Sequence, residues 1–378
     1  MTAQVLNIVE KHRPFLGNLA SLSDFSVSDG DEVDAEIVLS SPGVSLYCLD
    51  DATRRAIFVE LPPDIDLASA PFVYQLQYDQ ALRLIAMPYD TFCEVAHRLP
   101  EAQNLILIFS CGRSGTTLLS HVLNRLDNTL SLSEPDVASQ FIHMRPNDGS
   151  RDAELRELLD STVRMLFKPN AFKTPTTYAI KFRSEATQAM DLYQAAFPQA
   201  KFLYLYRDAV GYIASFYRLF RSINAPETTP LDEHLASINP SERDNFTRLM
   251  TYLDPGTTQI SIPQKATLAW LLKIEEYLAQ AAREIPVLSV RYIDLNQQRE
   301  QTLNAIFKYC DLPTDQVTQT LGAFEGDSQA GTLLAREKPT EGNTFRLTDA
   351  QIEEIRTILR QHPTVKVSDF IVPGTLTL

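Results

Sequence analysis

Cysteine is scarce in this sequence, and its spacing indicates neither a disulfide framework nor a zinc site. Only four cysteines occur among 378 residues, and no two form a C-x-x-C pair. They are Cys48, Cys93, Cys111 and Cys310. Only Cys111 falls within a motif, where a small buried residue in a tight turn is a better interpretation than a reactive thiol.

Long hydrophobic runs are also absent. No stretch reaches the roughly 18 consecutive apolar residues that a bilayer-spanning helix needs. The first residues mix charged side chains into their apolar positions, so they do not resemble a signal peptide. These charged residues are Glu10, Lys11, His12 and Arg13. We therefore expect a cytoplasmic protein that does not bind a membrane.

Basic residues are outnumbered, with 34 Lys and Arg against 48 Asp and Glu, and the net charge is −14. Such a surface repels nucleic acid, and we predict no nucleic-acid partner. An anionic nucleotide would be repelled too, unless a locally basic pocket held it.

Residues 1–100 differ in pattern from the rest and predict a small α+β N-terminal region of unknown role. An acidic, turn-rich segment covers residues 24–36. Short β-rich runs and one helix-like segment account for most of the remainder. The expected strands are residues 36–39, 44–48, 56–59 and 82–86, and the expected helix is residues 89–98.

Residues 101–378 alternate strand-like and helix-like segments, which predicts an α/β fold with a mainly parallel central sheet. The run Leu105–Phe109 is wholly apolar, as expected for a strand buried on both faces. The other expected strands are residues 178–182, 201–206 and 287–291, and the expected helices are residues 117–126, 209–220, 263–283 and 298–310. The proline-rich residues 222–262 predict an insertion that covers the substrate.

A glycine-containing turn follows the first of these strands and precedes a helix. Free backbone N–H groups and the positive end of the helix dipole make this arrangement a phosphate-binding geometry. Hydroxyl groups and one guanidinium supply further donors. The turn consists of Gly112, Arg113, Ser114, Gly115, Thr116 and Thr117.

The turn is not a Walker A loop, because no lysine follows Gly115. This argues against a P-loop kinase that binds ATP with Mg²⁺ and acts on a small molecule. A glycine turn that only caps the helix is the structural alternative.

The turn resembles the 5′-phosphosulfate loop of sulfotransferases that use 3′-phosphoadenosine 5′-phosphosulfate (PAPS). The resemblance implies a P-loop-like three-layer fold, PAPS as donor, 3′-phosphoadenosine 5′-phosphate (PAP) as product, and no metal. It also implies that Arg113 contacts the phosphosulfate bridge and that the following residues, Ser114, Gly115, Thr116 and Thr117, bind the 5′-phosphate together with Gly112.

A second motif has the spacing of the family's 3′-phosphate site. Arg207 ends the strand at residues 201–206, and Ser215 follows eight residues later in the next helix. Both side chains could reach one phosphate at the carboxyl edge of the sheet. Tyr292, after the last expected strand, resembles a tyrosine that approaches the nucleotide.

The spacing is most similar to that of the protein-tyrosine sulfotransferases, in which a glutamate at the position of Glu134 acts as general base. A solvated loop carboxylate is the alternative role for Glu134. His121 and His143 are alternative bases, because many relatives use histidine.

Lys181 has the position of a lysine that neutralises the transferred group in the same subgroup. An edge-strand lysine that reaches solvent is the alternative. The family's C-terminal nucleotide loop has candidates in Ser328, Gly331 and Lys338, although no R-K-G pattern occurs.

We therefore predict a transferase that moves a sulfuryl group to a hydroxyl or amine of a small-molecule or carrier-bound acceptor. A catalytically inactive nucleotide-binding module of the same fold is the alternative. The catalytic residues expected are Glu134, Arg113 and Lys181. The sequence carries no signal for the oligomeric state.

Overall fold

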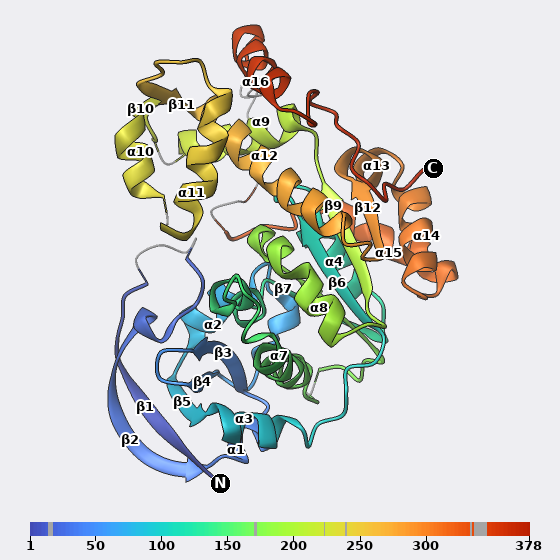
Figure 1. Cartoon of the computed structure of the whole chain (residues 1–378). Helices are drawn as coiled ribbons and strands as arrows, with labels where there is room; N and C mark the ends of the chain where they lie inside the picture. The colour runs from blue at the N-terminus through green and yellow to red at the C-terminus, as the bar shows by residue number, and fades with distance from the viewer. Residues whose placement is uncertain (14–17, 170–171, 223, 239, 333–334, 336–345) are drawn as a thin grey trace. The chain divides into compact units, whose positions relative to one another are not determined.

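The computed structural model describes the chain except residues 14–17, 170–171, 223, 239, 333–334 and 336–345. The described residues group into two compact units (Figure 1). The first unit contains residues 1–109, 117–202 and 315–325, and the second contains residues 110–116, 203–314 and 326–378. Residues 1–100 thus share a unit with residues 117–202, and the division at residue 100 stays a prediction.

The N-terminal region builds a five-stranded antiparallel sheet in the first unit, with the order β2-β1-β5-β4-β3. The strands are β1 (Thr2–Lys11), β2 (Phe25–Asp34), β3 (Val44–Asp50), β4 (Arg55–Glu60) and β5 (Arg83–Pro88). Phe58 in β4 faces Ile85 in β5, and both side chains are fully buried. The helices are α1 (Ile37–Ser40), α2 (Val73–Gln80) and α3 (Tyr89–Ala96). The predicted α+β composition is confirmed.

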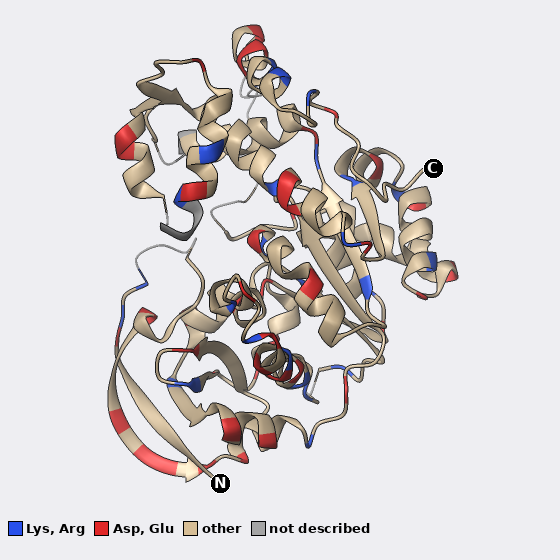
Figure 2. Cartoon of the chain, viewed as in Figure 1, with Lys and Arg blue, Asp and Glu red and all other residues tan. Residues whose placement is uncertain are grey.

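Two predictions in this region are wrong. Residues 36–39 were expected as a strand, but Ile37–Ser40 form the one-turn helix α1, because a short apolar run fits either structure. Residues 24–36 were expected as turns but contain β2, an edge strand with few buried side chains. Its exposed acidic residues, red along the ribbon in Figure 2, keep the open edge from pairing with another chain. They are Asp29, Asp31, Glu32 and Asp34.

The central sheet has five parallel strands in the order β12-β9-β6-β8-β7. They are β6 (Leu105–Ser110), β7 (Thr129–Ser133), β8 (Thr177–Lys181), β9 (Lys201–Tyr206) and β12 (Val287–Arg291). Every residue of β6 is buried, as its apolar sequence requires. The predicted α/β fold with a mainly parallel sheet is confirmed. Strand β7 was not predicted, because its alternating serines hide a strand that is fully buried.

Helices follow the strands along the chain, in agreement with the predicted alternation. The longer ones are α4 (Thr116–Asn124), α7 (Asp152–Leu166), α8 (Met190–Ala196), α9 (Ala209–Ser222), α12 (Ile262–Ala281), α14 (Arg299–Tyr309) and α16 (Asp349–Gln361). The shorter ones are α5 (Asp136–Ser139), α6 (Phe141–Met144), α13 (Tyr292–Gln297) and α15 (Val317–Thr320). No helix among the described residues is long and apolar enough to cross a bilayer.

Residues 222–262, expected as an insertion, contain secondary structure of their own. Helices α10 (Leu231–Ser237) and α11 (Pro240–Leu249) lie between the strands β10 (Thr228–Pro230) and β11 (Gln259–Ser261). The two strands pair in antiparallel fashion, with Thr229 opposite Ile260. That this insertion covers the substrate stays a prediction.

A buried ion-pair cluster ties the N-terminal region to the residues after β7 within the first unit. The carboxylate of Asp136 is fully buried and accepts hydrogen bonds from Arg183 Nε at 2.6 Å and from Arg13 Nη2 at 3.1 Å. The backbone N–H of Ala20 donates a further bond at 2.8 Å. Burial raises the pKa of Asp136 to about 6, although Arg183 opposes this shift. Asp136 therefore compensates the buried charge of both Arg183 and Arg13, and Arg13 also lies 3.8 Å from Asp24 Oδ2.

We expect Asp136→Asn to lower the free energy of unfolding by about 3–5 kcal/mol, because it leaves buried guanidinium charge uncompensated. Urea unfolding followed by circular dichroism measures this loss. Asp51→Asn is the matched control, since Asp51 pairs with Arg151 where both side chains are partly exposed. The control should lose less than about 1 kcal/mol. Equal losses would contradict a structural role for the buried cluster.

Candidate active site

Residues 111–115 form the turn between β6 and α4, and three of them have left-handed backbone conformations. The φ angles are 84° at Gly112, 53° at Arg113 and 85° at Gly115. Glycine adopts this region freely, but a branched or long side chain does so at a cost. A strained residue such as Arg113 persists where the surrounding structure holds it in place, and such residues cluster at functional sites.

Gly115 must be glycine for a second reason, which is close approach. A Cβ atom at this position would lie 3.0 Å from the ring of Tyr292 and 3.3 Å from a methyl carbon of Leu295. Both residues belong to α13 in the second unit. The turn therefore packs its backbone against Tyr292.

The guanidinium of Arg113 is partly buried and donates to two neutral acceptors. Its Nε donates to Ser215 Oγ at 2.8 Å, and its Nη1 donates to Gln329 Oε1 at 3.0 Å. Burial lowers the pKa of Arg113, and the charges of Arg207 and Arg218 lower it further. The site thus gathers positive charge around Ser215, as an anion-binding site should.

Arg207 completes this group of cations at the end of β9. Its guanidinium lies 4.5 Å from the ring centre of Tyr292, and its Nη1 donates to the carbonyl of Arg113 at 3.5 Å. Its Nε is buried without a hydrogen-bond partner, and burial lowers the pKa of the group. A buried, unused N–H donor on a cation is a position where an anionic ligand would bind.

Two neighbours fix the position of Arg207. The indole Nε1 of Trp270 donates to the Arg207 carbonyl at 2.9 Å, and Trp270 itself is fully buried. Gly211 lies against the side chain, because a Cβ there would stand 2.5 Å from Arg207 Nε. Asp208 Oδ1 accepts from the Gly211 backbone N–H at 2.7 Å, at the start of α9.

The second unit therefore brings together four predicted residues from four separate segments, namely Arg113, Arg207, Ser215 and Tyr292. The predicted Ser114 precedes Gly115 in the turn, and its hydroxyl is buried without a hydrogen bond. The predicted Thr116 begins α4, and Thr117 follows it; both are buried.

Sequence reasoning missed two residues of this cluster. Gln329 lies inside the C-terminal segment that supplied Ser328 and Gly331 as candidates, but only the fold shows that Gln329 reaches Arg113. Arg218 lies one helical turn after Ser215 on α9, and this spacing could have identified it. Ser328 is half-buried, Gly331 is exposed, and the third candidate, Lys338, lies outside the described residues.

Glu134 and Lys181 form an ion pair in the first unit, at the ends of β7 and β8. Lys181 lies opposite Ser133 in the strand register, and its side chain is 5% exposed. Because β8 lies between β6 and β7, the alternative of an edge-strand lysine in solvent is wrong. Glu134 also has a left-handed backbone, with φ of 52°.

The two histidines proposed as alternative bases lie on helices of the first unit. His121 is on α4, where burial lowers its pKa, and its Nε2 is buried without a partner. His143 is exposed on α6. Glu134 is the candidate base that forms an ion pair with the predicted Lys181.

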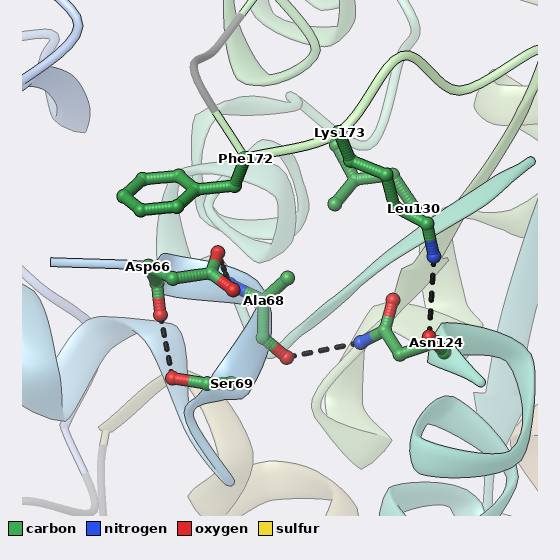
Figure 3. A pocket seen from close by; sticks show the side chains of 7 residues that line it. All are labelled: Asp66, Ala68, Ser69, Asn124, Leu130, Phe172 and Lys173. Atoms are coloured by element: carbon green, nitrogen blue, oxygen red, sulfur yellow. Dashed lines mark hydrogen bonds between the residues drawn. The ribbon is translucent and has the colours of Figure 1, made fainter. Parts of the chain in front are cut away.

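A cavity of about 250 Å³ lies elsewhere in the first unit (Figure 3). Its polar groups already bond to one another: Asn124 Nδ2 donates to the carbonyl of Ala68 at 2.9 Å, and Lys173 Nζ donates to the Asn124 carbonyl at 3.1 Å. No predicted site residue lines this cavity. Across the described ranges, no group of three or more His, Cys, Asp or Glu could hold a metal ion.

Comparison with known families identifies the domain that contains Arg113, Arg207, Ser215 and Tyr292. A family model described as "Sulfotransferase domain" matches residues 103–325, more than half of the chain. The chain belongs to the sulfotransferase domain family. The predicted family and the predicted transferase class are confirmed. The N-terminal antiparallel sheet lies outside the matched residues.

Several solved sulfotransferase structures are distantly similar to this family member. Sulfotransferase STF9 from Mycobacterium avium has 12% identity and a TM-score of 0.40 over 70% of this chain and 77% of its own. The sulfotransferase domain of the Synechococcus PCC 7002 olefin synthase has 16% identity and a TM-score of 0.37 over 74% and 92%. Mouse sulfotransferase SULT7A1, complexed with PAP, has 13% identity and a TM-score of 0.38 over 71% and 88%. No curated protein sequence matches the chain significantly.

We expect Gly115→Ala to destabilise this sulfotransferase more than Gly256→Ala does. Both glycines have φ near 85°, but only at Gly115 would a methyl group meet other atoms, since nothing lies within 4 Å at Gly256. The shared conformational cost is about 1–2 kcal/mol, and the contact with Tyr292 adds to it at Gly115 alone. Urea unfolding of both variants measures the difference, and equal losses would show that the turn does not pack against Tyr292 in solution.

Proposed function

We propose that this sulfotransferase moves the sulfuryl group of PAPS to an acceptor hydroxyl or amine. One observation supports the choice of donor: Arg113 and Arg207 lie side by side and are partly buried, and the buried Arg207 Nε has no hydrogen-bond partner among the described residues. Neither guanidinium forms a salt bridge with a carboxylate of the part of the chain that the structure describes. Two neighbouring, partly buried cations repel each other, and a polyanionic nucleotide would supply the missing countercharge.

The donor has two anionic ends, and the cluster offers separate groups for them. We assign the 5′-phosphosulfate to Arg113 and to the backbone N–H groups of the turn at the start of α4. We assign the 3′-phosphate to Arg207 and Ser215, whose hydroxyl already bonds to Arg113. Tyr292 would contact the nucleotide beside Arg207. This assignment gives the 3′-phosphate its own cation, which distinguishes PAPS from ATP.

The transfer step needs a base and a cation near the sulfuryl group, and we assign these roles to Glu134 and Lys181. The acceptor oxygen or nitrogen attacks sulfur, and the bond from sulfur to the bridging oxygen of the 5′-phosphate breaks. The acceptor proton passes to the Glu134 carboxylate, and PAP leaves with the electron pair of the broken bond. Lys181 and Arg113 stabilise negative charge on the sulfuryl and bridging oxygens, and one such donor is typically worth about 3–4 kcal/mol.

We place the acceptor, a small molecule or a group on a carrier, against residues 135–175 and 222–262. The second of these segments contains α10, α11 and the short β10–β11 sheet. We also propose a cytoplasmic location.

We expect Arg207→Ala to weaken PAP binding about 10–100-fold, because a charged hydrogen bond to a phosphate contributes about 1.5–3 kcal/mol. Binding of ADP, which has no 3′-phosphate, should change less than about 2-fold. Isothermal titration calorimetry with both nucleotides measures this contrast. Arg356→Ala, which removes an exposed arginine from α16, is the control for net charge. Equal losses for PAP and ADP would disprove the 3′-phosphate assignment.

We expect Glu134→Gln to lower kcat about 10²–10⁴-fold while PAP affinity stays within about 2-fold, because the amide cannot accept the acceptor proton. Steady-state transfer assays and calorimetry on the same preparation measure the two quantities. Glu94→Gln, at an exposed position on α3, is the matched control and should keep full activity. A wild-type protein that binds PAP but transfers to no acceptor would instead support the inactive-module alternative.

A further inference from the structure

The backbone of Glu134 is held by two hydrogen bonds that come from different parts of the first unit. Its N–H donates to the carbonyl of Lys181 at 2.7 Å, and its carbonyl accepts from the N–H of Tyr74 at 3.3 Å. Both residues of the first bond lie within residues 103–325, which match the sulfotransferase domain. The second comes from the N-terminal region, outside residues 103–325.

The N–H group that donates the second hydrogen bond lies in the first turn of helix α2. Tyr74 is the second residue of α2, and N–H groups in the first turn of a helix have no partner within the helix. A second bond runs beside it, from Ser133 Oγ to the carbonyl of Pro71 at 2.6 Å. Residues 71–74 thus lie along residues 133–134 and bond to them at two points.

Aromatic rings of the same segment cover the cations near Glu134. Lys181 Nζ lies 5.4 Å from the ring centre of Phe72, and the Arg183 guanidinium lies 4.0 Å from that of Tyr74. The two rings stack, with centres 5.7 Å apart and planes 19° apart. Because Phe72 is only 4% exposed, its ring also keeps water from one side of Lys181.

We propose that residues 71–74 of the N-terminal region are positioning residues for sulfuryl transfer, which hold Glu134 and Lys181 in place. This inference rests on the proposed roles of those two residues. It gives the N-terminal region, whose role the sequence left open, a part in the reaction.

The left-handed backbone of Glu134 explains why such support is needed. A non-glycine residue in this conformation is typically strained and relaxes unless its surroundings hold it. Its carbonyl bond to Tyr74 and the attachment of Ser133 to Pro71 oppose that relaxation. A displacement of about 1 Å in a reacting group typically costs about 100-fold in rate. Loosening residues 71–74 should therefore reduce turnover without reducing donor binding.

Phe72→Leu is the main test, because it removes the ring but keeps an apolar side chain. We expect kcat to fall about 10–100-fold, with the KM for PAPS within about 2-fold of wild type. Phe72→Tyr restores a ring and should keep kcat within about 3-fold. Phe92→Leu is the matched control: Phe92 is fully buried in the same region and packs on Phe58, with ring centres 6.0 Å apart. It should lower stability but leave kcat per folded molecule unchanged.

Ser133→Ala is a milder variant that removes only the hydroxyl bond to Pro71, in case Phe72→Leu does not fold. We expect kcat to fall about 3–10-fold, because one lost hydrogen bond is worth about 1 kcal/mol. We also expect faster hydrogen exchange at the Glu134 backbone amide. The proposal is overturned if Ser133→Ala and Phe72→Leu keep wild-type kcat, or if Phe92→Leu loses as much kcat per folded molecule as Phe72→Leu. A wild-type protein that transfers nothing from PAPS would refute the proposed function instead, so the two failures are distinguishable.

Discussion

The hydrogen bond from Arg113 to Ser215 is the interaction on which the candidate site depends. It joins the turn after β6 to helix α9 and orients a partly buried guanidinium that Gln329 holds from a third segment. The left-handed conformation of Arg113 and the close approach of Gly115 to Tyr292 both follow from the need to bring this turn near α9 and α13. The left-handed backbone of Arg113 costs the fold free energy, and binding of an anion would offset this cost.

The cations of the candidate site have different partners from Arg183 and Lys181. In the first unit, Arg183 bonds to Asp136 and Lys181 to Glu134, whereas the buried Lys168 donates to the carbonyls of Val38 and Ser41. In the second unit, Arg113 and Arg207 bond to neutral acceptors, within the ranges that the structure describes. A chain with a net charge of −14 could easily have provided a carboxylate there. Arg113 and Arg207 therefore form the cluster at which an anionic ligand would supply the countercharge.

Much of the fold could be predicted from the sequence, because a strand whose residues are nearly all apolar, such as β6, is recognisable from its sequence alone. Strand β2 could not, since an acidic edge strand has no buried face to reveal it. In the site, the spacing of Arg207 and Ser215 was enough to place both residues, because a strand end and the following helix are local in sequence. Gln329 could not be predicted to reach Arg113, 216 residues away, because that contact exists only in the folded chain.

The most direct test of the central claim is a transfer assay with PAPS labelled in its sulfate group. The wild-type protein is incubated, without metal, with phenols, sugars, peptides and carrier-bound hydroxyl compounds. Our account predicts that label appears on at least one acceptor class in equal amount to the PAP released. No transfer of label to any acceptor, together with Mg²⁺-dependent phosphate transfer from ATP to one of them, would contradict it.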